Sequence, residues 1–144
     1  MDYQRILVAV DLGGEADALC SRARDLADRY SARLAIIHVV EPIVPTPPYE
    51  LPGVMPLELE QQMLEQARRR LEKLADKYQI SETDVIVEAG ATKATINDVA
   101  ADRNIDLIVV GSHGRHGVGL LLGSTANAVL HHAKCDVLAV RIGP

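Results

Sequence analysis

Five short runs of mostly apolar residues are spaced along the chain and predict five buried β-strands. They occupy positions 6–10, 34–40, 84–88, 107–111 and 136–142. Valine and isoleucine are frequent in them, and polar residues do not alternate with apolar ones. Continuous runs of this kind are typical of strands that are buried on both faces of a parallel sheet.

Between these runs, apolar residues recur every three or four positions, which predicts amphipathic helices. One such pattern runs from Ala16 to Tyr30, and a longer, charge-rich one runs from Met63 to Tyr78. Segments 92–104 and 124–132 supply two more helices, with Thr92 and Ser124 as the expected N-caps. The alternation predicts an α/β fold: a single domain over residues 1–144 with a five-stranded parallel open sheet and helices on both faces.

Residues 41–56 interrupt this alternation. The segment holds six of the seven prolines, and proline is excluded from helix interiors and central strands. We expect a proline-rich surface insertion after the second strand. It is either a plain connector or a flap over a site at that end of the sheet.

The net charge is −5, so the composition does not indicate binding to nucleic acid or to an anionic membrane surface. No apolar run approaches the length of a transmembrane span. The two cysteines, Cys20 and Cys135, lie far apart in apolar contexts and are expected to be buried, reduced thiols rather than a disulfide or a reactive site. These features predict a cytoplasmic protein without nucleic-acid or membrane partners.

Ligands of open parallel sheets bind beyond the carboxyl ends of the strands, where the strand order reverses. Asp11 is the first charged residue after the first apolar run. Its position fits either of two roles, an N-cap of the following helix or a contact to a ligand.

The connection from Gly111 to Thr125 holds five of the ten glycines. It is not a Walker A loop, because Gly123 is followed by Ser124 and not by lysine. A dinucleotide fingerprint is disfavoured too, since it should follow its strand directly. What remains is a strand, a glycine-rich turn and a helix N-terminus, an arrangement that suits an anion. Hydroxyls of Ser124 and Thr125, with the charges of Arg115 and His116, would add to it.

The segments "ILVAVD", "LAIIHVVEP", "DLIVVGSHGR" and "LLLGSTANAVLHHAKCDVLAVR" resemble the universal stress protein family, from Arg5 to Arg141. The resemblance implies a Rossmann-like fold of the adenine nucleotide alpha hydrolase type. Nucleotide-binding members of the family show the pattern G-x2-G-x9-G-(S/T). Here Gly111, Gly114 and Gly123 with its following serine match it, but eight residues instead of nine precede the last glycine. Another branch of the family lacks the motif and does not hold ATP.

The resemblance implies ATP or AMP as ligand, with or without Mg²⁺. It also implies ten contact residues, which we carry over by position. Those near the nucleoside are Ala9, Asp11, Val39, Val110 and Gly111, and those near the phosphates are Gly114, Arg115, Gly123, Ser124 and Thr125.

Three functions stay open at this point. The favoured one is a regulatory homodimer that binds adenine nucleotide and pairs through its last strand, from Val137 to Ile142. The second is a nucleotide-free scaffold of the same fold, and the third is a weak ATPase. No nucleophile–base pair is evident, and the histidines lack partners at metal-ligand spacing. We therefore predict neither a catalytic residue nor a metal site, and the sequence does not identify the protein partner.

Overall fold

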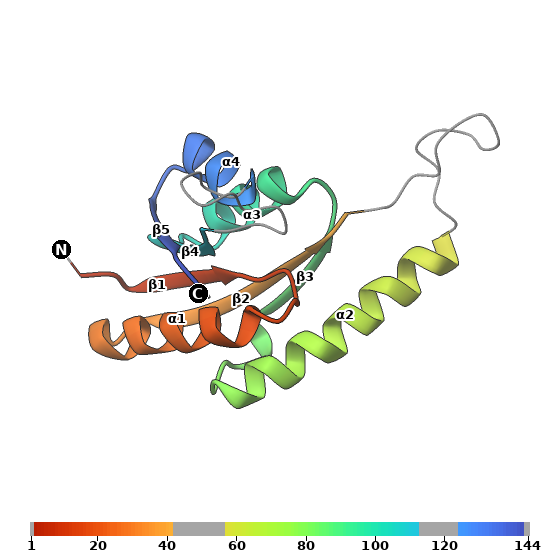
Figure 1. Ribbon diagram of the computed structural model, residues 1–144, viewed down its shortest axis with the longest axis horizontal. Helices are drawn as coiled ribbons and strands as arrows, with labels where there is room; N and C mark the ends of the chain where they lie inside the picture. Colours follow the sequence, from red (N-terminus) through yellow and green to blue (C-terminus); the bar gives the residue numbers. More distant parts are fainter. Residues whose placement is uncertain (1, 42–56, 113–123, 143–144) are drawn as a thin grey trace.

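A computed structural model describes residues 2–41, 57–112 and 124–142, and its centre is a parallel sheet of five strands (Figure 1). The strands are β1 (Arg5–Ala9), β2 (Arg33–Val40), β3 (Val85–Ala89), β4 (Leu107–Gly111) and β5 (Asp136–Val140). Their order in the sheet is β3-β2-β1-β4-β5. The α/β fold and the five parallel strands are confirmed.

The strand order reverses between β1 and β4. From β1 the chain proceeds outward through β2 to β3, and then returns to the other side of β1 for β4 and β5. The register is tight at the centre, where Ile6 pairs with both Leu34 and Leu107. Reversal at this point leaves a crevice at the carboxyl ends of β1 and β4.

Six predicted strand limits were wrong, five of them by one residue and the last by two, and two of these differences have a clear structural reason. The third strand begins at Val85, because Asp84 ends a short 3-10 turn (Glu82–Asp84) and its carboxylate pairs with Arg33. The last strand ends at Val140, so Ile142 lies beyond it. Asp84 is outside the strand and makes a side-chain contact, and Ile142 is outside the strand and lines the pocket described below.

Two helices cover each face of the sheet (Figure 1). The helices α1 (Ala16–Tyr30) and α2 (Leu57–Lys77) bury apolar stripes on one face, where Ile6 and Val8 point. The helices α3 (Thr92–Asp102) and α4 (Ser124–His132) cover the other face, where Leu7 points. Because side chains alternate along a strand, both faces of each central strand must be apolar, as the continuous runs predict.

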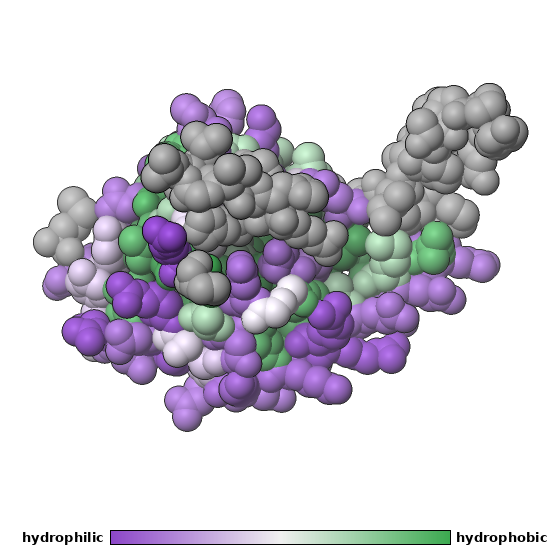
Figure 2. Space-filling view, viewed as in Figure 1, coloured by the Kyte–Doolittle hydropathy of each residue, from purple (hydrophilic) through white to green (hydrophobic). Residues whose placement is uncertain are grey.

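The second helix is longer than the sheet that it covers. Its buried residues Ala67, Leu71 and Ala75 lie toward its C-terminal half, whereas its first turns extend beyond the sheet (Figure 1). Leu57 is 67% exposed there, and hydrophobic residues are visible at this end of the helix (Figure 2). Across the described residues, no helix is both long and apolar enough to span a membrane.

The expected N-cap of the third helix was wrong by one residue. The cap is Ala91, and Thr92 is already helical, so its side chain is available for another contact. The fourth helix begins at Ser124, whose side chain is outside the described residues. The proline-rich segment 42–56 is likewise outside them.

Both cysteines are free. Cys20 is fully buried, and burial raises the pKa of its thiol to about 12. Cys135 is half-buried, and desolvation raises the pKa of its thiol as well. The prediction of reduced thiols agrees with this structure, although Cys135 is less buried than we expected.

Candidate functional site

A cavity of about 150 Å³ lies at the carboxyl ends of β1, β2 and β4, where the strand order reverses. Its walls come from these strand ends and from the first turns of α1, α3 and α4. The loop of residues 113–123, which connects β4 to α4, lies outside the described residues. Pockets for small molecules and cofactors usually have volumes of about 300–1,000 Å³, so the described walls form only part of such a site.

Six of the ten residues carried over from the family resemblance line this cavity. They come from three strands, the turn after β1 and the helix α4, and they are Ala9, Asp11, Val39, Val110, Gly111 and Thr125. Gly114, Arg115 and Gly123 lie outside the described residues, and Ser124 is described only as the first residue of α4. The fold thus brings the six together, and nucleotide contact by any of the ten stays a prediction.

Asp11 is not the N-cap of the following helix, because that position is taken by Glu15. Instead, its Oδ1 accepts a hydrogen bond from the Gly13 amide at 2.9 Å and closes a tight turn at the exit of β1. A Cβ on Gly13 would lie 3.1 Å from the same oxygen, so the glycine permits this turn. Of the two roles left open for Asp11, helix capping is excluded.

The turn continues through Leu12, which has a positive φ of 63°. A left-handed conformation is unfavourable for a bulky residue and has to be held by its surroundings. Arg70 of α2 donates a hydrogen bond to the Leu12 carbonyl at 2.6 Å. The exit of β1 is therefore fixed from both sides, by Asp11 and by the second helix.

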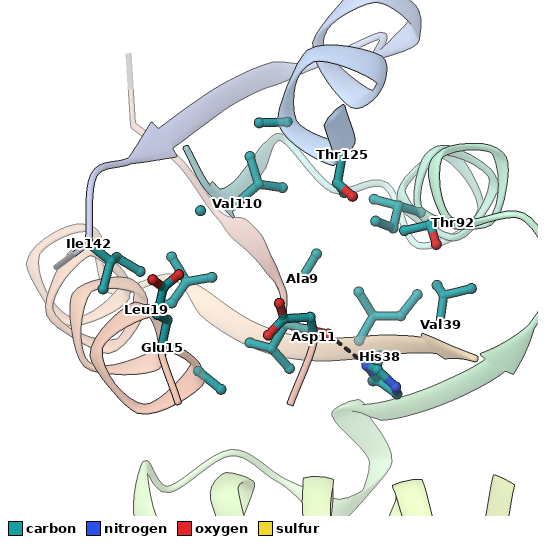
Figure 3. A pocket seen from close by; sticks show the side chains of 16 residues that line it. Ala9, Asp11, Glu15, Leu19, His38, Val39, Thr92, Val110, Thr125 and Ile142 are labelled. Atoms are coloured by element: carbon teal, nitrogen blue, oxygen red, sulfur yellow. Dashed lines mark hydrogen bonds between the residues drawn. The ribbon is translucent and has the colours of Figure 1, made fainter. Parts of the chain in front are cut away.

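His38, in β2, has a hydrogen-bond partner in the backbone. Its Nδ1 lies 2.8 Å from the Val10 carbonyl and donates to it, which places the proton on that nitrogen (Figure 3). The imidazole links the end of β2 to the end of β1, and its ring forms part of the pocket wall. The hydrogen bond holds the ends of these two strands together in the wall of the pocket.

A contact between Glu41 and Thr92 was missed from the sequence. The carboxylate of Glu41, directly after β2, accepts hydrogen bonds from both the amide and the hydroxyl of Thr92. The Thr92 hydroxyl lowers the pKa of this carboxyl below its usual range, and the Thr92 amide lowers it further. The pair ties the end of β2 to the start of α3, and residues 51 positions apart give no local pattern that could reveal it.

Glu15, Leu19 and Ile142 also line the cavity and were not predicted. Figure 3 shows them together on one side of the pocket, with Val39 and Thr92 on the opposite side and Ala9 and Asp11 between. Glu15 and Leu19 belong to the start of α1, and Ile142 follows the edge strand β5. Their meeting depends on the packing of distant elements, so no motif in the sequence indicates it.

The described walls carry two carboxylates as well as aliphatic surface. Asp11 and Glu15 contribute carboxylates, whereas Ile37, Val39 and Ile96 contribute aliphatic surface. None of the described lining residues is lysine or arginine. An aliphatic wall suits a flat ring, and carboxylates suit hydroxyl or amino donors. No cluster of three metal-ligating side chains occurs among the residues that the structure describes.

Comparison with known proteins places the chain among relatives of one kind. A curated relative from Coxiella burnetii, universal stress protein A homolog 2, is 45% identical over 143 residues, which are 98% of this chain and 97% of that protein. Universal stress protein A homolog 1 from the same organism is 39% identical over 97% of both chains.

Solved structures agree with the fold. The universal stress protein UspA from Lactobacillus plantarum superposes with a TM-score of 0.68 at 30% identity and covers 99% of both chains. A universal stress protein in complex with cAMP superposes with a TM-score of 0.63 at 25% identity, covering 99% of this chain and all of that one. The universal stress protein family profile matches residues 2–141. The chain belongs to the universal stress protein family.

Proposed function

We propose that this chain is a cytoplasmic regulatory protein that binds ATP or AMP, with or without Mg²⁺, in the pocket at the carboxyl ends of β1, β2 and β4. One observation carries the proposal. The fold gathers Ala9, Asp11, Val39, Val110, Gly111 and Thr125 around one cavity at the reversal of strand order. This is the position at which doubly wound sheets bind nucleotides.

The two kinds of wall suggest how the nucleotide lies. The adenine ring packs against the aliphatic side formed by Ile37, Val39 and Ile96. The phosphates approach the N-terminus of α4, where Thr125 offers a hydroxyl and the first amides of the helix are directed at an anion. A relative of the same fold that is described in complex with cAMP supports an adenine nucleotide as ligand.

We also propose a homodimer that pairs through β5. This strand lies at the edge of the sheet, and its apolar residues Val137 to Val140 are only half-buried. An exposed apolar edge favours pairing with a second copy. Light scattering at micromolar concentration should give twice the mass of one chain, and a monomer would contradict the proposal.

The nucleotide proposal is tested by native mass spectrometry of freshly purified protein, followed by titration calorimetry with ATP and AMP. Ala9→Leu adds three carbons where β1 enters the cavity and should weaken binding about 5- to 150-fold, because overfilling a packed space costs about 1–3 kcal/mol. Ala18→Leu is the matched control, since this alanine is exposed on α1 and does not line the cavity. If the native protein and the control bind neither nucleotide, the scaffold function replaces this one.

A further inference from the structure

Glu15 occupies the N-cap position of α1, yet its carboxylate does not cap the helix. Its backbone is in the right-handed helical region, with φ −92° and ψ −8°, and the side chain makes no capping hydrogen bond. A productive N-cap usually has extended backbone and an oxygen on a free amide. Serine, threonine, aspartate or asparagine would cap this helix better, so the glutamate contributes to the helix only through the attraction between its charge and the positive end of the dipole.

The Glu15 side chain instead lines the pocket, beside Leu19 and Ile142 (Figure 3). Within the described part of the chain, no hydrogen bond or ion pair involves its carboxylate. Asp11, the second carboxylate in the pocket, already accepts one bond from Gly13. The carboxylate of Glu15 therefore has acceptor sites available to a ligand.

We propose that Glu15 selects adenine nucleotides whose ribose 2′ and 3′ hydroxyls are free, and rejects those that carry a phosphate charge at the 3′ oxygen. This inference rests on the proposed function. With the base against Val39 and the phosphates near Thr125, the sugar lies in the middle of the pocket beside Asp11. Its hydroxyl edge turns toward Glu15 at the start of α1 (Figure 3). A carboxylate accepts hydrogen bonds from two neighbouring hydroxyls, and such charge-assisted bonds are stronger than neutral ones.

A 3′,5′-cyclic phosphate changes both the hydroxyl donors and the charge of the sugar. It removes the 3′ hydroxyl donor and places a negative charge on the edge of the sugar that faces the carboxylates. Repulsion between like charges then opposes binding, reduced by solvent because Glu15 is exposed. The related universal stress protein is described in complex with cAMP, whereas we expect this chain to bind AMP more tightly.

The experiment compares AMP, cAMP and adenosine 3′,5′-bisphosphate by titration calorimetry on the native chain, Glu15→Gln and Glu88→Gln. The substitution of Glu15 removes the charge and keeps the shape. Glu88 is an exposed residue of β3 that does not line the pocket, so its variant controls for net charge. The native chain should bind AMP about tenfold more tightly than either 3′-phosphorylated compound.

In Glu15→Gln the preference for AMP should fall to about threefold or less, and in Glu88→Gln it should stay as in the native chain. Raising the salt concentration should also reduce the native preference, because exposed charges are screened. Two results overturn the inference alone: AMP binds but Glu15→Gln keeps the full preference, or the native chain prefers cAMP. Absence of binding by all three compounds to all three proteins overturns the proposed function and this inference with it.

Discussion

Gly90 is the residue whose replacement tests most directly how the wall of the pocket is built. It follows β3 and precedes α3, and its amide donates to the Val40 carbonyl at 3.0 Å. Its φ is +151°, a conformation that residues with a Cβ rarely adopt. An ideal Cβ on this residue would also lie 2.9 Å from the hydroxyl of Thr95, in the first turns of α3.

Two costs therefore add in Gly90→Ala. Forcing alanine into a glycine-only region costs about 1–3 kcal/mol, and relief of the Thr95 contact costs more. The lower entropy of the unfolded chain offsets about 0.4–1 kcal/mol. We expect a net loss of about 2 kcal/mol in the free energy of unfolding. With an unfolding entropy of about 2.1 cal/mol/K per residue, 144 residues give a fall in Tm of about 7 °C.

Chemical and thermal denaturation of four variants measure this loss. Gly14→Ala is the matched control, because a Cβ there meets nothing within 4 Å and no positive φ constrains it, so its stability should stay within about 0.5 kcal/mol or rise. Thr95→Ala and the double variant Gly90→Ala with Thr95→Ala distinguish the free-energy cost of the steric contact from that of the backbone conformation. If Gly90→Ala is no less stable than Gly14→Ala, the reasoning about this turn is refuted.

Three further predictions concern titratable groups. Thr92 lowers the pKa of Glu41 from its ordinary 4.5. The charged carboxylate therefore stabilises the fold above pH 4.5, and this stabilisation is lost as the pH falls through the lowered pKa. Acid denaturation should be less steep in Glu41→Gln. Asp17 raises the pKa of Tyr78 to about 12 through a hydrogen bond, so this contribution is present below pH 10 and is lost as the pH rises through about 12. The ultraviolet titration step near pH 12 should be absent from Tyr78→Phe. In Cys135→Ser, the remaining thiol of Cys20 should react with a disulfide reagent at pH 8 only after denaturant is added, since it is buried with a pKa of about 12.

The sheet could be predicted because both of its faces are buried. Strands such as β4 (Leu107–Gly111) consist of apolar residues throughout, and the helices between them show one apolar stripe each. The limits of elements could not be predicted where a polar contact overrides the pattern. Asp84 pairs with Arg33 and lies outside β3. Thr92 is helical and is not the N-cap, because its amide and hydroxyl donate to the carboxylate of Glu41, 51 positions earlier.

Some residues of the candidate site could likewise be predicted from the sequence, and others could not. Asp11 and Gly111 could be placed in it from sequence, because Asp11 directly follows one predicted strand and Gly111 ends another, and the carboxyl ends of parallel strands share one edge. Glu15, Leu19 and Ile142 could not, since they reach the cavity through the packing of α1 and the segment after β5. These residues belong to no motif, and only the tertiary structure brings them beside Asp11.

Asp84 and Glu15 lie at opposite ends of the strands and differ in the partners of their carboxylates, and this difference is itself testable. At the amino ends of the strands, Asp84 is 5% exposed, and its two carboxylate oxygens share the Nε–H of Arg33 at 2.9 and 3.1 Å. The carboxylate of Asp106 accepts hydrogen bonds from the amides of Gln4 and Arg5. At the carboxyl edge, the carboxylate of Glu15 is exposed and makes no such bond within the described residues.

Removal of the charge should therefore affect stability at Asp84 and hardly affect it at Glu15. Asp84→Asn weakens a pair whose carboxylate is buried, and should lower the free energy of unfolding by about 1–2 kcal/mol. That is less than the roughly 3–5 kcal/mol for a fully buried pair, because the side chain of Arg33 is 62% exposed and regains water. Glu15→Gln should change stability by less than about 0.5 kcal/mol and alter only the choice of ligand. Equal losses of stability in the two variants, measured by urea denaturation, would mean that Glu15 supports the fold and is not reserved for a ligand.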